Sequence, residues 1–91
     1  MIKVLVIGAC GKMGREVVSA VYNDNETQIV GAVDLVNNGV DIGSIVLNKE
    51  IGVKIESNLE KAKGLMPRAL TIHVEIMAVA PGVSQTENIK I

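Results

Sequence analysis

The sequence has almost no aromatic residues, because Tyr22 stands alone without any tryptophan or phenylalanine. A core must therefore be built from Val, Ile, Leu, Met and Ala, and such cores suit parallel sheets whose β-branched strands are covered by helices on both faces. Prolines number only two, 48% of the residues are apolar and 21% are charged, which excludes a disordered chain. With 91 residues, we expect one domain over residues 1–91 and no room for a second.

Cysteine is equally scarce. Cys10 alone forms no internal disulfide and no metal site, so we expect a reducing, cytoplasmic setting and no bound metal. The net charge is −1 and no Lys or Arg cluster stands out, which argues against a nucleic-acid partner. No apolar stretch approaches the ~18 residues of a membrane span, so we predict no membrane partner.

What the sequence does contain is a strand, helix and strand in close succession at its start. Ile2–Ile7 is short, apolar and β-branched and predicts a buried strand. From Met13 the apolar positions recur at helical spacing, and a turn-forming cluster near Asn23 ends the helix. Gln28–Val33 predicts a second strand, closed by Asp34. This order predicts a parallel βαβ unit with a right-handed crossover.

The pattern is weaker after Asp34. The expected elements there are a short helix over Asp41–Leu47 capped by Asp41, a short edge strand over Val53–Ile55, a helix over Ser57–Lys63, a strand over Leu70–Ala80, and the start of a helix in 83–91. Ser57 and Glu60 stand at capping-box spacing, and Gly64 is expected to end that helix. His73 is expected to be a polar residue on one face of its strand, without a catalytic role.

Three glycines, Gly8, Gly11 and Gly14, lie at the junction of the first strand and the first helix with the spacing G-x-x-G-x-x-G. In a dinucleotide-binding βαβ unit the first glycine permits a tight turn, the second lets the backbone approach a pyrophosphate, and the third lets helix and strand pack closely. We expect bare main-chain amides throughout this turn and at the helix start to hold the phosphates. Glycines also serve ordinary strand-to-helix turns, so the triad alone is weak support.

Asp34 strengthens the interpretation because it stands 20 residues after Gly14, at the end of the second strand. An acidic residue there bonds the adenosine ribose hydroxyls, although most aspartates that end strands are turn residues or caps. Together with the glycines, it predicts an α/β, Rossmann-like parallel sheet with flanking helices. A carboxylate repels the extra phosphate of NADP, so NAD is preferred, while Lys12 and Arg15 leave NADP binding possible.

The predicted site is thus a binding site, without catalytic or metal-ligating residues. Its expected cofactor-binding residues are Gly8, Ala9, Cys10, Gly11, Lys12, Met13, Gly14 and Asp34. A thiol near a helix N-terminus can be reactive. For Cys10 we favour the role of a small side chain in the turn, because no base for nucleophilic use is identifiable.

The stretches GACGKMGREVV, IVGAVD and DIGSI together resemble the N-terminal part of the 4-hydroxy-tetrahydrodipicolinate reductases (dihydrodipicolinate reductases) of lysine biosynthesis. The matching motifs are the loop Gly8–Arg15, the strand Val30–Asp34, the element Asp41–Gly43 and the segment Gly52–Ala62. The resemblance implies a two-domain, usually tetrameric enzyme that passes hydride from NADH or NADPH to a cyclic dehydration product. It further implies that the loop holds the pyrophosphate, that Asp34 binds the adenosine ribose, and that Lys12 lies near the adenosine side.

The sequence departs from the family in two places. Leu35 stands where an arginine usually follows the acidic residue, and roughly Lys63 to Thr86 matches no family motif, although ENIKI at the end does again. The His-His pair, lysine and threonine-rich loop of the family's substrate domain are not among the 91 residues. We therefore expect a truncated, cofactor-binding part of the reductase that is inactive alone and able to form homo-oligomers. The alternative is a non-catalytic Rossmann module that binds nucleotide or only oligomerises.

Overall fold

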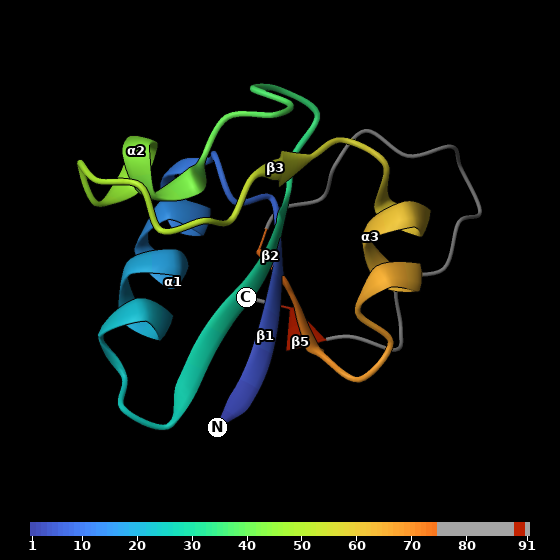
Figure 1. Ribbon diagram of the computed structural model, residues 1–91, viewed down its shortest axis with the longest axis horizontal. Helices are drawn as coiled ribbons and strands as arrows, with labels where there is room; N and C mark the ends of the chain where they lie inside the picture. Colours follow the sequence, from blue (N-terminus) through green and yellow to red (C-terminus); the bar gives the residue numbers. More distant parts are fainter. Residues whose placement is uncertain (75–88, 91) are drawn as a thin grey trace.

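The computed structural model of the chain describes residues 1–74 and 89–90 (Figure 1). The elements in chain order are β1 (Ile2–Ile7), α1 (Lys12–Asn23), β2 (Thr27–Val33), α2 (Ile42–Val46), β3 (Ile55–Glu56), α3 (Leu59–Leu65), β4 (Leu70–His73) and β5 (Ile89–Lys90). The first strand, the first helix and the second strand lie where the sequence predicts them. No helix among the described residues has both the length and the apolar character needed to cross a membrane.

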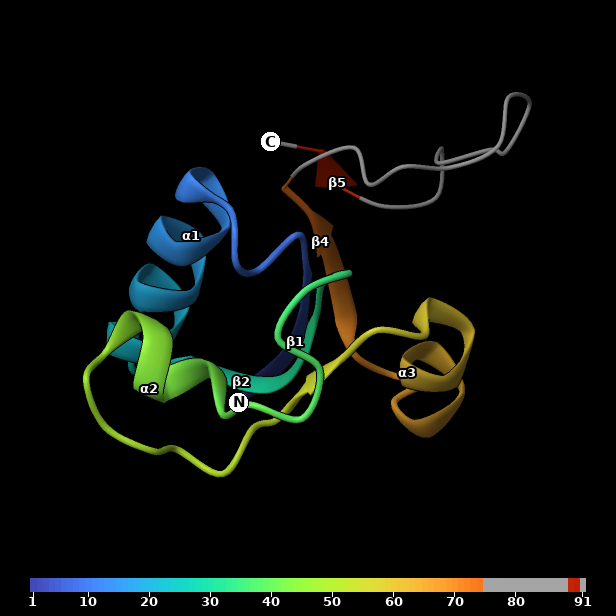
Figure 2. The same ribbon diagram turned by 90° about the horizontal axis from the view of Figure 1, so that it is seen from above.

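The five strands form one sheet in the order β3-β2-β1-β4-β5, and all of its strand pairs are parallel. Seen from above, α1 and α2 cover one face of the sheet and α3 lies on the other (Figure 2). The predicted Rossmann-like α/β class is confirmed. Because β2 and β3 lie on one side of β1 and β4 lies on the other, the strand order reverses beside β1. In open α/β sheets, ligands bind at the carboxyl ends of the strands at such a switch point.

The core is aliphatic and β1 runs through its centre. Val4 and Val6 belong to the cluster beneath α1 and α2, while Leu5 and Ile7 belong to the cluster beneath α3. All four side chains are at most 2% exposed. A strand buried on both faces uses β-branched and aliphatic residues at every position, which is why this core needs no aromatic side chain.

The turn between β1 and α1 depends on two glycines. Gly8 has a φ of 85°, in the left-handed region that favours glycine. A methyl group on Gly14 would overlap the carbonyl oxygen of Gly8 and lie 2.7 Å from its carbonyl carbon and 2.9 Å from that of Ala9. The first turn of α1 therefore packs directly on the backbone that leaves β1, as expected for the third glycine of the triad.

Asp41 organises the segment around α2. It caps the helix as predicted, and its buried carboxylate accepts hydrogen bonds from the amides of Gly43 (2.8 Å), Ile51 (3.1 Å) and Gly52 (2.7 Å). Burial by itself raises the pKa of the Asp41 carboxyl, but the hydrogen bonds from Ile51, Gly52 and Gly43 outweigh it, so the pKa lies below its ordinary value. One carboxylate thus ties the helix to a loop that follows it.

The predicted ends of α3 are wrong. The cap is Asn58, whose side chain accepts from the amide of Lys61 at 3.0 Å, and not Ser57. The acidic partner in this cap is Glu56, which accepts from the amide of Asn58 at 2.9 Å, so the predicted capping box with Glu60 does not form. The helix also continues beyond Gly64 to Leu65, because Gly64 keeps helical geometry instead of turning the chain.

The predictions for the last three strands have different outcomes. β3 occupies Ile55–Glu56, slightly later than Val53–Ile55, because these residues are the ones that pair with the end of β2. The predicted strand from Leu70 is confirmed as far as His73, and 75–80 lie outside the described residues. Of the segment 83–91, in which a helix was expected to start, 83–88 and 91 lie outside the described residues, and Ile89–Lys90 instead pairs with the end of β4 as a strand.

Gly14→Ala should destabilise the fold by at least about 1–3 kcal/mol, because the added methyl meets backbone that has no room to move. Thermal unfolding followed by circular dichroism measures this. The matched control is Gly64→Ala within α3, where the methyl meets nothing within 4 Å. That variant should gain up to about 1 kcal/mol from the higher helix propensity of alanine. Equal stabilities of the two variants would contradict the packing described for Gly14.

Asp41→Asn should lower the melting temperature at pH 7 by at least about 5 °C, because the acceptor loses its charge and an NH2 donor replaces one of the two oxygens that face three amides. A carboxyl whose pKa is lowered by folding stabilises above its unfolded pKa of about 3.9, and this stabilisation disappears as the pH falls through the folded pKa. The difference between wild type and variant should therefore shrink below about pH 4. Asp24→Asn, at an exposed turn, removes the same charge as a control, and a difference that stays constant with pH would refute the role of Asp41.

Candidate functional site

The residues predicted to form the site meet at the carboxyl end of β1, on the edge of the sheet where the strand order reverses. The turn from Gly8 to Gly11 leaves the strand, and α1 starts at Lys12. Ala9 and Gly14 are buried in the turn and under the helix, whereas Lys12 and Met13 are exposed on the first turn of α1. The structure therefore brings all the predicted turn residues together, with the exposed ones at the start of the helix.

Most amides of the turn itself are already used within the chain. Those of Gly8 and Ala9 donate to the carbonyl oxygen of Val33, at 2.8 and 3.2 Å, and that of Gly11 donates to the carbonyl of Gly8 at 3.3 Å. The amide of Cys10 is bonded as well, to a side chain considered below. The expectation of bare amides throughout the turn is thus wrong, because pairing with β2 occupies the amides of Gly8 and Ala9, and bonds within the turn and to a side chain occupy the other two.

The open amides belong instead to the first turn of α1. Within residues 1–74 and 89–90, the amides of Lys12, Met13 and Gly14 donate no hydrogen bond, and Arg15 is the first to bond along the helix, to the carbonyl of Gly11. The first amides of any helix lack an intrahelical partner. The part of the sequence prediction that placed free amides at the helix start agrees with this geometry.

The caps of the three helices explain why these amides stay open. Asp41 caps α2 and Asn58 caps α3, each with a side-chain hydrogen bond to an amide of the first turn. The cap of α1 is Gly11, which has no side chain to offer, and the first turn of α1 carries no acidic residue. The positive end of the α1 dipole is therefore left for an external anion.

Asp34 lies directly beside this turn, at the end of β2. Its Oδ2 accepts from the amide of Cys10 at 3.0 Å, and its Oδ1 accepts a longer bond from the amide of Val36 at 3.4 Å. The carboxylate is partly exposed, and it has four lone-pair sites, of which these amides use two. It retains acceptor capacity for hydroxyl groups of a ligand next to the start of α1.

Cys10 is a half-buried free thiol in the turn. Burial raises the pKa of this thiol above its ordinary value, despite an opposing hydrogen bond from Asn37 and the positive charge of Arg15. A raised pKa leaves little reactive thiolate at neutral pH. This agrees with the interpretation of Cys10 as a small side chain in the turn.

The sequence reasoning overlooked Asn37. Its Nδ2 donates to Sγ of Cys10 at 3.7 Å, so the loop after β2 contacts the glycine turn at a second point. The residue has a φ of 61°, a left-handed conformation that asparagine adopts more readily than most residues. The signal for such a bend in the sequence is the Asn-Asn-Gly stretch at 37–39, because these residue types favour turns.

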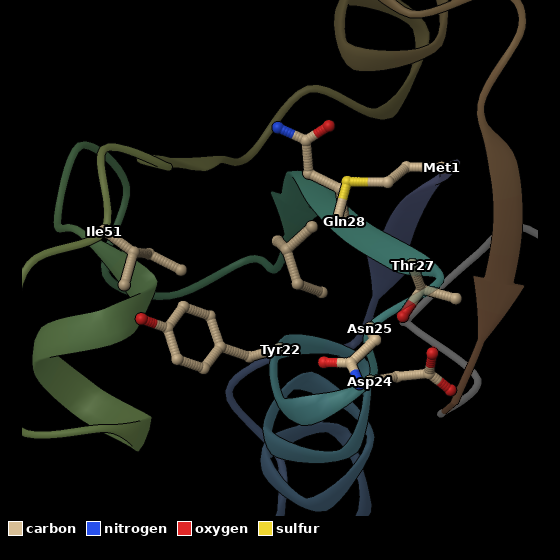
Figure 3. Close-up of a pocket in the computed structure, with 8 residues that line it drawn as sticks. Met1, Tyr22, Asp24, Asn25, Thr27, Gln28 and Ile51 are labelled. Carbon is tan, nitrogen blue, oxygen red and sulfur yellow. The ribbon is translucent and has the colours of Figure 1, made fainter.

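Two hollows lie at opposite edges of the sheet. One of about 580 Å³ is lined by Asn38, Ser57 and Asn58 and opens at the end of β3, next to the strand that carries Asp34. A more enclosed one of about 350 Å³ lies at the opposite, amino-terminal edge of the sheet, where Tyr22 reaches toward Ile51 (Figure 3). The first hollow adjoins the candidate site, and the second belongs to the far edge of the sheet. No group of three His, Cys, Asp or Glu suited to a metal ion occurs among the described residues.

Comparison with known proteins identifies the family. The profile described as "Dihydrodipicolinate reductase, N-terminus" matches residues 2–71. The chain belongs to the dihydrodipicolinate reductase family. The match continues to residue 71, so the departure from the family expected from Lys63 onward is wrong for 63–71, which carry the end of α3 and the start of β4.

Curated relatives named 4-hydroxy-tetrahydrodipicolinate reductase agree with this assignment. Those of Carboxydothermus hydrogenoformans and Prochlorococcus marinus are 41% and 44% identical over 61 residues, which cover 67% and 65% of this chain and 23% and 22% of the relatives. That of Methanococcus aeolicus is 38% identical over 91 aligned residues, which cover 92% of this chain and 32% of the relative. The chain thus spans between about a fifth and a third of the length of these relatives.

Dihydrodipicolinate reductases are oxidoreductases of lysine biosynthesis that use a nicotinamide dinucleotide, NAD(P)H. The matched N-terminal part is the one that binds this dinucleotide. The sheet edge with the glycine turn, the open start of α1 and Asp34 belongs to that part.

Proposed function

We propose that this chain is the dinucleotide-binding part of a 4-hydroxy-tetrahydrodipicolinate reductase and that its cofactor binds across the start of α1 and the end of β2. The observation that carries the proposal is the uncapped start of α1 beside a partly exposed carboxylate. The amides of Lys12, Met13 and Gly14 suit an anionic diphosphate, and Asp34 suits a hydroxylated ribose. These two ligand chemistries, side by side, fit the two linked parts of a dinucleotide.

In this proposal, different residues bind different parts of the cofactor. The segment from Gly8 to Gly14 holds the diphosphate, with Gly8, Ala9 and Cys10 shaping the turn and Lys12 and Met13 supplying exposed amides. Asp34 accepts from the adenosine ribose, and the hollow at the end of β3 leaves room on that side. When bound, the nicotinamide carries the hydride that the relatives' reaction consumes, and these residues bind and orient it without taking part in the transfer.

At position 11, a glycine matters because it leaves space, and not because of its backbone conformation. Its φ of −72° and ψ of 170° are open to every residue. A glycine there leaves the helix start without a side-chain cap and without a methyl group between the backbone and a ligand. Both consequences favour close approach of a diphosphate.

The proposal extends to cellular location and assembly. A free, half-buried thiol at Cys10 is stable in a reducing compartment, which supports a cytoplasmic location. We also propose that the complete reductase self-associates, with Leu65 and Leu70, which are 68% and 41% exposed, among the apolar side chains available for contact.

The decisive measurement is a calorimetric titration of NADH into the chain. Wild type should bind, and Gly11→Ala should lose measurable binding while folding normally, because its methyl occupies the approach to the diphosphate. Gly64→Ala, the same change on α3 and away from the turn, should bind as wild type does. Failure of wild type to bind NADH, or unchanged binding by Gly11→Ala, would overturn the proposal.

We also propose a preference for NAD over NADP, since Asp34 repels a 2′-phosphate and Leu35 offers no cation to receive one. Asp34→Ala should lower the ratio of NADH to NADPH affinity by about tenfold, because it removes charge-assisted bonds to the ribose made only with NADH. Dissociation constants for both cofactors, measured with wild type and variant, give this ratio. Tighter binding of NADPH than NADH by tenfold in wild type would refute the preference.

A further inference from the structure

Two loops that are distant in sequence meet at Cys10. The amide of Cys10 donates to Oδ2 of Asp34 at 3.0 Å, across 24 residues of chain. Its Sγ accepts from Nδ2 of Asn37 at 3.7 Å. The glycine turn is therefore attached to the loop after β2 through both the backbone and the side chain of a single residue.

The bond to Asp34 differs in kind from the others that hold the turn. The amides of Gly8, Ala9 and Gly11 all donate to backbone carbonyl oxygens. Only Cys10, among these four, donates to a side chain, and that side chain is an ionised acceptor, which makes the hydrogen bond strong. Among the amides of these four residues, that of Cys10 is therefore the one whose hydrogen bond depends on the identity of an acceptor side chain.

We infer that Asp34 is a positioning residue for the diphosphate-binding turn, in addition to being the acceptor for a ribose. Its bond to Cys10 holds the turn immediately before Gly11, the residue from which α1 starts. The direction in which the first amides of α1 point is thereby coupled to the carboxylate at the end of β2. The part of this inference that concerns diphosphate binding rests on the proposed function.

The two roles do not exclude each other. A carboxylate has four lone-pair sites, and the amides of Cys10 and Val36 occupy two of them. The same side chain is able to accept from a ribose while it restrains the turn. An asparagine would keep an acceptor oxygen for Cys10 but lose the charge, whereas an alanine would lose both.

Inorganic pyrophosphate separates positioning from ribose binding, because it contains no ribose. Asp34→Ala and Asp34→Asn remove the same negative charge, so their difference reports the hydrogen bonds that the side chain accepts, of which the one from Cys10 reaches the glycine turn. We expect Asp34→Asn to bind pyrophosphate about threefold to tenfold more tightly than Asp34→Ala. Asp24→Ala, at the far end of α1, removes one negative charge away from the turn and should leave the affinity within about twofold of wild type.

Amide hydrogen exchange of Cys10, followed by NMR in the ligand-free chain, tests the restraint directly. Exchange should be at least about fivefold faster in Asp34→Ala than in wild type and largely restored in Asp34→Asn, while the amide of Arg15 within α1 stays protected in all three. Unchanged exchange in Asp34→Ala, or equal pyrophosphate affinities of the two Asp34 variants, overturns the inference. If wild type binds neither pyrophosphate nor NADH, the proposed function and the part of the inference that concerns diphosphate binding both fail, and the exchange rates still decide whether Asp34 restrains the turn.

Discussion

The contact between Gly14 and the backbone of Gly8 is the constraint on which this structure depends. It lets α1 begin immediately above the end of β1, where any side chain at position 14 would meet backbone atoms. Because β1 is the central strand, buried on both faces, the position of α1 is set relative to the whole sheet. The start of the helix is consequently placed at the edge where the strand order reverses, which is the place where open α/β sheets bind their ligands.

The three helices differ in how their first turns are capped. The side chains of Asp41 and Asn58 complete the first turns of α2 and α3, so those helix starts are closed. Gly11 leaves the first turn of α1 open, and the helix dipole there has no acidic residue to meet it. The open first turn of α1 is the feature that suits an anion, and the family binds a nicotinamide dinucleotide, whose diphosphate is the anion that we propose for this position.

Asp34 connects the two halves of the candidate site. It was expected to be an acceptor for a ribose, and the structure shows that it also accepts from the backbone of the glycine turn. A single carboxylate thus contacts the turn and faces the space beside it. The loop after β2 and the turn after β1 are attached to each other at Cys10, so the parts of the candidate site are not independent of one another.

The sequence alone determined the βαβ start and the class of fold, because short apolar β-branched runs, helical spacing and the glycine triad are local patterns. It also identified Asp41 as a cap, since that role needs only neighbouring residues. Tertiary structure alone decided which amides are open, because the carbonyl of Val33 that occupies those of Gly8 and Ala9 lies on another strand. It likewise decided that Ile89–Lys90 is a strand and that Asp34 reaches Cys10. Neither strand pairing nor a contact between residues 24 positions apart produces a periodic pattern in the sequence.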